Sequence, residues 1–154
     1  MLLSYLMEPA TLVAVVGPAL ITLWALTHSP MNGAQWRAWL VCTFLSTMTV
    51  RWELKEDAQQ LFILPIIFAW MAVDLYRGIP WRSAQAYAAS FLSLWSVDMM
   101  HAANLYASGQ MMSDTFYYGV GGAGWGDGLF LTPLIAAALP AYVAWRRKKQ
   151  FVTI

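Results

Sequence analysis

Cysteine and charge are what this sequence has least of. Its 154 residues include a single cysteine, Cys42, and only 11% are Asp, Glu, Lys or Arg. One cysteine excludes an intramolecular disulfide, a zinc ribbon and a CxxC redox pair. The formal net charge is +1, and the basic residues are scattered singly except at 146–149, which argues against a nucleic-acid partner.

Side chains that bind metals are also scarce. His28 and His101 are the two histidines, and no cysteine or second deep histidine accompanies His101. A haem or metal ligand set is therefore hard to assemble, and we expect no metal and no cofactor. The N-terminus lacks the basic region and small-residue cleavage pattern of a signal peptide, so we expect the first apolar segment to be retained.

Apolar residues are what the sequence has in excess. They make up 60% of the chain, which also contains nine tryptophans, and these are not values of a soluble domain. The apolar residues are gathered into segments long enough to cross a hydrocarbon core of about 30 Å. We therefore predict one polytopic membrane domain over residues 1–154, all-α, with the lipid bilayer as its surroundings.

Five segments are predicted to form a bundle of transmembrane helices. They cover roughly residues 9–27, 36–52, 61–76, 84–107 and 129–145, with a glycine-rich outer loop at 108–128 and a basic cytoplasmic tail at 146–154. The segment from Trp36 to Trp52 has the shortest charge-free stretch, so the bundle has four crossings if this segment does not span.

Three local features refine this prediction. Gly17-Pro18 is expected to kink the first helix. The mixed-charge run from Arg51 to Asp57 is expected to be a solvated helix extension or a loop. Asp74 is spaced to pair with Arg77 near the membrane surface.

The basic residues predict the orientation of the bundle. With five crossings, seven Lys and Arg residues fall on the side of the C-terminus, and only Arg51 and Lys55 fall on the other side. Cytoplasmic loops are enriched in Lys and Arg. We therefore predict a bacterial-type inner membrane protein with its N-terminus outside and its C-terminus in the cytoplasm.

Asp98 and His101 are the ionisable residues predicted deepest in the membrane. They lie three residues apart on the segment 84–107 and so share a helical face. At 1.5 Å per residue, Asp98 lies on the order of 13 Å below the outer surface. A charge at such depth is costly, so two hypotheses remain open. The pair is a proton relay or general acid/base couple, or the two side chains only satisfy each other or the backbone.

A glycine-rich run follows this segment. Residues 119–128 contain six of the ten glycines in the chain, and Asp114 and Asp127 lie close by in sequence. The run is too aromatic for a fully solvated loop, so we expect it to lie against the membrane or the bundle. Asp127 is spaced to cap the last helix, because a carboxylate near a helix N-terminus accepts exposed backbone N–H groups.

Gly124-Trp125-Gly126-Asp127 also resembles the GxGD signature of intramembrane aspartyl proteases, the group of presenilin, signal peptide peptidase and prepilin peptidase. In that group a second aspartate on the preceding helix completes a dyad, and Asp98 stands in a comparable position. The resemblance implies that Asp127 and Asp98 share a proton and activate water for peptide-bond hydrolysis. It also implies that the glycine run folds back into the bundle.

Three classes of function remain open on the sequence alone. The leading one is a small membrane protein that acts through membrane or protein contacts, either as an accessory subunit or as a phage- or plasmid-type exclusion or lysis factor; it forms a homo-oligomer or binds a membrane-protein partner. The second is a membrane-embedded hydrolase with an outward-opening site. The third is a proton-linked transporter or oligomeric channel. The candidate site residues are Asp98, His101, Asp114 and Asp127.

Overall fold

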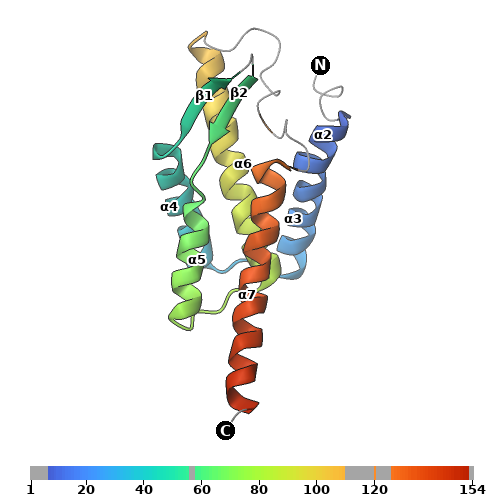
Figure 1. Ribbon diagram of the computed structural model, residues 1–154, viewed down its shortest axis with the longest axis vertical. Helices are drawn as coiled ribbons and strands as arrows, with labels where there is room; N and C mark the ends of the chain where they lie inside the picture. Colours follow the sequence, from blue (N-terminus) through green and yellow to red (C-terminus); the bar gives the residue numbers. More distant parts are fainter. Residues whose placement is uncertain (1–6, 56–57, 110–119, 121–125, 153–154) are drawn as a thin grey trace.

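A computed structural model describes residues 7–55, 58–109, 120 and 126–152 of the chain. These residues form an elongated helical bundle with a small β-hairpin at one end (Figure 1). The first described residues lie at the hairpin end, and the last helix leaves the bundle at the opposite end.

The first helical segment runs from Pro9 to His28 in three parts. They are α2 (Pro9–Thr11), a single turn of π-helix, η1 (Leu12–Val16), and α3 (Gly17–His28). Proline lacks an N–H and crowds the carbonyl four residues earlier. The chain widens ahead of Pro18, and the Gly17 N–H donates to the Leu12 carbonyl five residues back. The disturbance expected at Gly17-Pro18 therefore takes the form of a π-turn.

The second helix, α4, covers Gly33–Met48 and has a reciprocal N-terminal cap. The Gln35 N–H donates to Asn32 Oδ1 at 2.9 Å, and the Asn32 N–H donates to Gln35 Oε1 at 3.0 Å. This pair satisfies two of the backbone donors that every helix start leaves open. The helix ends four residues before the predicted Trp52, and its 16 residues span about 24 Å.

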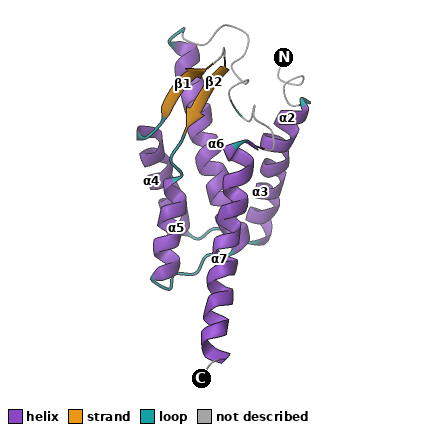
Figure 2. Cartoon of the chain, in the orientation of Figure 1, coloured by secondary structure: helices purple, strands orange, loops and turns teal. Residues whose placement is uncertain are grey.

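Between α4 and α5 the chain forms an antiparallel hairpin of β1 (Arg51–Lys55) and β2 (Ala58–Phe62), in which Arg51 pairs with Phe62 (Figure 2). The run from Arg51 to Asp57 was predicted as a helix extension or loop, and this is wrong for Arg51–Lys55. The sequence alternates polar and apolar residues there, which is the period of a strand. The hairpin adds one small sheet to an otherwise all-α fold.

Helix α5 covers Ile66–Tyr76, so the predicted segment 61–76 begins five residues too early. Its start is fixed to the end of α4, because Ser46 Oγ donates to the Leu64 carbonyl at 2.9 Å. With 11 residues, α5 spans about 16 Å.

Helix α6 covers Ser83–Ala107, within one residue of the predicted segment, and packs against α3, α4 and α7. Its small residues allow these neighbours to approach closely. Five of them are buried: Ala86, Ala88, Ala89, Ser90 and Ser93.

Helix α7 covers Gly128–Val152 and so continues through the residues predicted as a separate basic tail. Near its lower end the Arg147 guanidinium donates to the Leu75 carbonyl of α5 at 2.8 Å. This bond satisfies a carbonyl at the C-terminal end of α5 and ties the basic run to the bundle.

The described helices hide polar groups and expose large apolar ones. Leu40, Phe44 and Met48 form a stripe along α4 and are 62%, 63% and 68% exposed, while Thr22 and Gln35 are buried. Two described helices, Pro9–His28 and Gly128–Lys149, are long and apolar enough to cross a membrane. The five helices of the described chain thus include two candidate membrane spans.

Candidate functional site

Asp98 lies in the interior of the bundle. Its side chain is 6% exposed, on the face of α6 that also carries Leu94 and Ala102, one turn before and one turn after it. Those two residues belong to an apolar cluster with Ala14 and Val15 of the first helix and with Leu129 of α7. The carboxyl group of Asp98 therefore lies in apolar surroundings.

Asp127 caps the first turn of α7. The Leu129 N–H donates to Asp127 Oδ1 at 2.8 Å, and the N–H groups of Phe130 and Leu131 both donate to the Asp127 carbonyl at 3.0 Å. The predicted capping role is confirmed. The cap also fixes the Asp127 carboxylate beside Leu129, which is buried in the same apolar cluster that surrounds Asp98.

The packing of α6 against α7 brings the two aspartates together. Their carboxylates lie close enough to repel each other when both are ionised. A partly buried pair is little screened by solvent, so this repulsion is stronger than it would be between two surface carboxylates. Asp127 therefore serves as a helix cap and also lies near the deep carboxyl group of Asp98.

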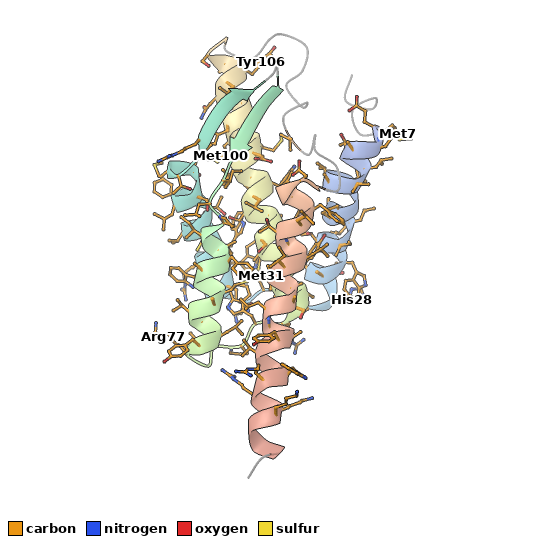
Figure 3. The ribbon with its side chains drawn as sticks, in the orientation of Figure 1. Met7, His28, Met31, Arg77, Met100 and Tyr106 are labelled. Carbon is orange, nitrogen blue, oxygen red and sulfur yellow. The ribbon has the colours of Figure 1, made fainter. Side chains whose placement is uncertain are left out.

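Several buried polar atoms of the bundle have no hydrogen-bond partner among the described residues. One of them, His101 Nε2, lies one turn from Asp98 on α6; the others are Ser90 Oγ and Tyr87 Oη earlier on α6, Thr22 Oγ1 on α3, Trp39 Nε1 on α4, and Ser29 Oγ. No described residue donates a hydrogen bond to the Asp98 carboxylate either. Buried polar groups are nearly always satisfied, and an exception calls for a specific explanation. In Figure 3, Met100 and Tyr106 mark the half of α6 that carries Asp98 and His101.

Besides Asp127, a second described residue of the glycine-rich run, Val120, packs beside the site. Val120 is 1% exposed and packs in the cluster that contains Leu94 and Leu129. The expectation that the run lies against the bundle is confirmed at this residue. Asp114, a candidate site residue, and the first two residues of the GxGD-like motif, Gly124 and Trp125, lie outside the described residues.

Gly126, between Trp125 and Asp127, is not required by the fold as described. A Cβ atom at this position would meet nothing within 4 Å, and its backbone is not in the left-handed region. Gly126 is exposed, so another backbone can approach the chain closely at this position, next to Asp127 in sequence.

The other histidine, His28, contacts residues of its own helix, α3. Its Nδ1 lies 2.9 Å from the Trp24 carbonyl and 3.0 Å from Thr27 Oγ1, and its ring stacks on Trp24. His28 is exposed at the end of α3, as Figure 3 shows. Within the described ranges, no group of three or more His, Cys, Asp or Glu residues comes together to hold a metal ion.

A second polar region, which the sequence did not reveal, lies at the opposite end of the bundle. A cavity of about 430 Å³ opens between α4 and α5, and Arg37, Asp74 and Arg77 are among the residues that line it. The predicted pair of Asp74 and Arg77 is wrong for the described chain. Asp74 Oδ2 instead accepts a hydrogen bond from Trp81 Nε1 at 2.9 Å. The indole of Trp81, seven residues after Asp74, is the hydrogen-bond donor to this carboxylate, and Arg77 lines the cavity without pairing with it.

No protein-family model, no curated protein and no solved structure matches this chain.

Proposed function

We propose that this chain is a multi-pass protein of a bacterial-type inner membrane, with its N-terminus outside and its C-terminus in the cytoplasm. The exposed apolar stripe of α4 and the two apolar helices Pro9–His28 and Gly128–Lys149 support the membrane location. The basic end of α7 and Arg77 lie at the end of the molecule opposite the hairpin (Figures 1 and 3), which supports the orientation.

Helices α4 and α5 are the two shortest of the proposed membrane crossings. A hairpin with open edges has backbone groups that hydrocarbon cannot satisfy. We therefore assign β1 and β2 to the outer membrane surface, where water reaches them. The short length of α4 and α5 is compatible with local thinning of the bilayer around them.

Within this membrane domain we propose an acid–base site formed by Asp98 and Asp127, with His101 beside it. The observations that carry the proposal are the burial of Asp98, the packing of α6 against α7, and the electrostatic influence of the Asp127 carboxylate on Asp98. Keeping a carboxyl group in apolar surroundings, with no hydrogen-bond donor among the described residues, costs stability, and an ionisable residue inside a membrane segment is by default a candidate functional residue.

The sharpest form of this function is hydrolysis of a peptide bond by the aspartate pair. The ionised carboxylate takes a proton from water, whose oxygen bonds to the carbonyl carbon, and the other carboxyl group donates its proton to the carbonyl oxygen. The carbon–nitrogen bond then breaks as the leaving nitrogen takes a proton from one carboxyl group, while a hydroxyl group of the intermediate gives its proton to the other carboxylate and becomes the new carbonyl. Atoms and charges balance with water as the only co-reactant. The buried Nε2 of His101 offers one more proton donor or acceptor one turn away.

The experiment uses a photoreactive peptide that carries a hydroxyethylene group, because this group imitates the tetrahedral intermediate. We expect the full-length protein in detergent to be labelled by this probe. Asp98→Asn and Asp127→Asn should each abolish the labelling, because a neutral amide cannot replace the shared proton. Asp74→Asn is the matched control, since Asp74 lies at the cavity end and an amide oxygen can still accept from Trp81. Equal labelling of all four proteins would refute the hydrolytic site.

A second candidate function is action through membrane or protein contacts, without catalysis. The stripe of Leu40, Phe44 and Met48 favours it, because three strongly exposed apolar residues at four-residue spacing fit a partner helix as well as lipid. A protein of this class would keep its cellular effect in both Asn variants and would not bind the probe. If the aspartates instead carry protons across the membrane, the reconstituted protein shows a pH-dependent proton flux between about pH 5 and 8.

A further inference from the structure

The end of the bundle opposite the hairpin, here called the basic end, contains the cavity between α4 and α5, which is lined by both charged and apolar residues. It lies between the first turns of α4 and the last turns of α5, and its wall includes Gln35, Arg37, Val41, Trp70, Asp74 and Arg77. Its volume of about 430 Å³ falls within the range of small-molecule sites.

The residues that line the cavity carry a net positive charge. Arg37 and Arg77 both line it, and neither guanidinium has an ion pair or hydrogen bond within the described part of the chain. Asp74, the single acidic residue of the wall, offsets one of the two positive charges and accepts a hydrogen bond from Trp81. The remaining positive charge favours an anion, and guanidinium is the side chain best suited to phosphate.

The rim of the cavity is apolar and continues along the bundle. Val41, Trp70 and Ile79 are 44%, 42% and 43% exposed beside the arginines. Exposed apolar residues extend from there along α4, including Phe44 and Met48, away from the basic end. A free phosphate or other small anion would leave this apolar surface uncovered, whereas a molecule with a phosphate and an acyl chain would cover both parts.

We propose that this cavity binds the headgroup of an anionic phospholipid from the cytoplasmic leaflet, with Arg37 and Arg77 on the phosphate and an acyl chain over Val41 and Trp70. The inference rests on the proposed membrane placement, which puts the cavity at the cytoplasmic surface, where anionic lipid gathers near basic residues. It is independent of the aspartate pair. The two arginines come from different helices, so a bound headgroup also holds α4 to α5.

The test is native mass spectrometry of the full-length protein in detergent, titrated with phosphatidylglycerol. Phosphatidylcholine and inorganic phosphate serve as the comparison ligands. We expect retention of phosphatidylglycerol at one site, little retention of phosphatidylcholine and no displacement by millimolar phosphate. Loss of both charges in Arg37→Gln/Arg77→Gln should weaken binding about 30-fold, on the basis of the contribution of each basic residue at an anionic surface.

Two further variants keep the proposal open to refutation. Arg146→Gln/Lys148→Gln removes the same charge at the same end of the molecule, outside the cavity, and should retain tight binding. Arg37→Lys/Arg77→Lys keeps the charge and should recover part of the affinity. Equal weakening in the two Gln variants would mean general attraction to the basic end and would overturn the cavity site. Equal retention of phosphatidylcholine, or displacement by phosphate, would overturn the anionic lipid as occupant.

The membrane placement is tested separately, by the fraction of the chain that sediments with membranes and resists alkaline extraction. Recovery of the chain in the soluble fraction would refute the placement whatever the lipid titration shows. A chain that sediments with membranes but does not retain phosphatidylglycerol would refute the lipid site alone.

Discussion

Two buried polar regions of this molecule differ in how their groups are satisfied. At the basic end, Gln35 bonds Asn32 and also donates to Gln85 Oε1 at 3.1 Å, and Gln85 donates to the Pro30 carbonyl at 2.9 Å. Beside Asp98, no described residue donates a hydrogen bond to the carboxylate, and the buried His101 Nε2 one turn away has no partner among the described residues. Ser29 Oγ and Trp39 Nε1, near the Gln35 network in sequence, are also buried without a partner there but are not part of that network. The hydrogen bonding of the first region is typical of a structural network, whereas unsatisfied buried groups such as those of the second region are typical of a functional site.

This difference predicts opposite responses to mutation. Removing a group from a satisfied network leaves its partners buried and unbonded, which costs the desolvation of each. Removing a group that has no partner leaves nothing behind. Removing polar side chains near Gln35 should therefore lower the free energy of unfolding. Removing those near Asp98 should impair function and leave the free energy of unfolding nearly unchanged.

The largest effect is expected at Gln35, which is 3% exposed. Gln35→Leu removes the bonds to the Asn32 N–H and to Gln85, so we expect the free energy of unfolding to fall by about 3 kcal/mol. Denaturant unfolding in mild detergent measures it. Asn104→Leu, at an exposed amide of α6, is the control and should stay within about 0.5 kcal/mol of the wild type. A similar small change at Gln35 would mean that the network is dispensable.

A smaller but cleaner contrast uses two serines of α6. Ser90 and Ser93 are both buried, but only Ser93 has a partner, because Thr43 Oγ1 donates to its Oγ at 3.0 Å. Ser93→Ala should lower the free energy of unfolding by about 1 kcal/mol, and Ser90→Ala should leave it unchanged or raise it. Equal losses in the two variants, measured in the same unfolding assay, would contradict the premise that removing a buried polar group is costly only where it has a partner.

The smallest effect on stability is expected at Gly126, where an added methyl group meets open space. Gly126→Ala should change the free energy of unfolding by less than about 0.5 kcal/mol. Labelling by the hydroxyethylene peptide should fall several-fold, because the methyl group occupies space that the peptide backbone needs beside Asp127. Unchanged labelling of this variant would show that substrate does not approach from this side.

Much of the helical fold was predictable from the sequence, and the exceptions have physical causes. The long run of apolar and small residues gives α6 within one residue. The charged residues of Arg51–Asp57 favoured a solvated helix or loop in the prediction. The alternation of the apolar residues Trp52 and Leu54 with charged residues was the signal for a strand. Helix α7 continues to Val152 because Arg and Lys are good helix formers and Arg147 is held at Leu75.

The candidate site was predictable in part. The depth of Asp98 and the cap at Asp127 follow from position along one helix each, which periodicity and capping rules address. Their proximity depends on how α6 packs against α7, which no local pattern determines. The cavity of Arg37 and Arg77 joins residues 40 positions apart, and the indole of Trp81 displaced the local partner that spacing suggested for Asp74.

A double-mutant cycle on Asp98 and Asp127 tests the central claim most directly. The free energy of unfolding of Asp98→Asn, Asp127→Asn and the double variant is compared with that of the wild type. If the carboxylates form a working pair, either single substitution relieves their repulsion and the second adds little. We therefore predict a coupling free energy of at least about 0.5 kcal/mol. Strict additivity of the two substitutions would mean that the aspartates do not act on each other, and would contradict the proposed site.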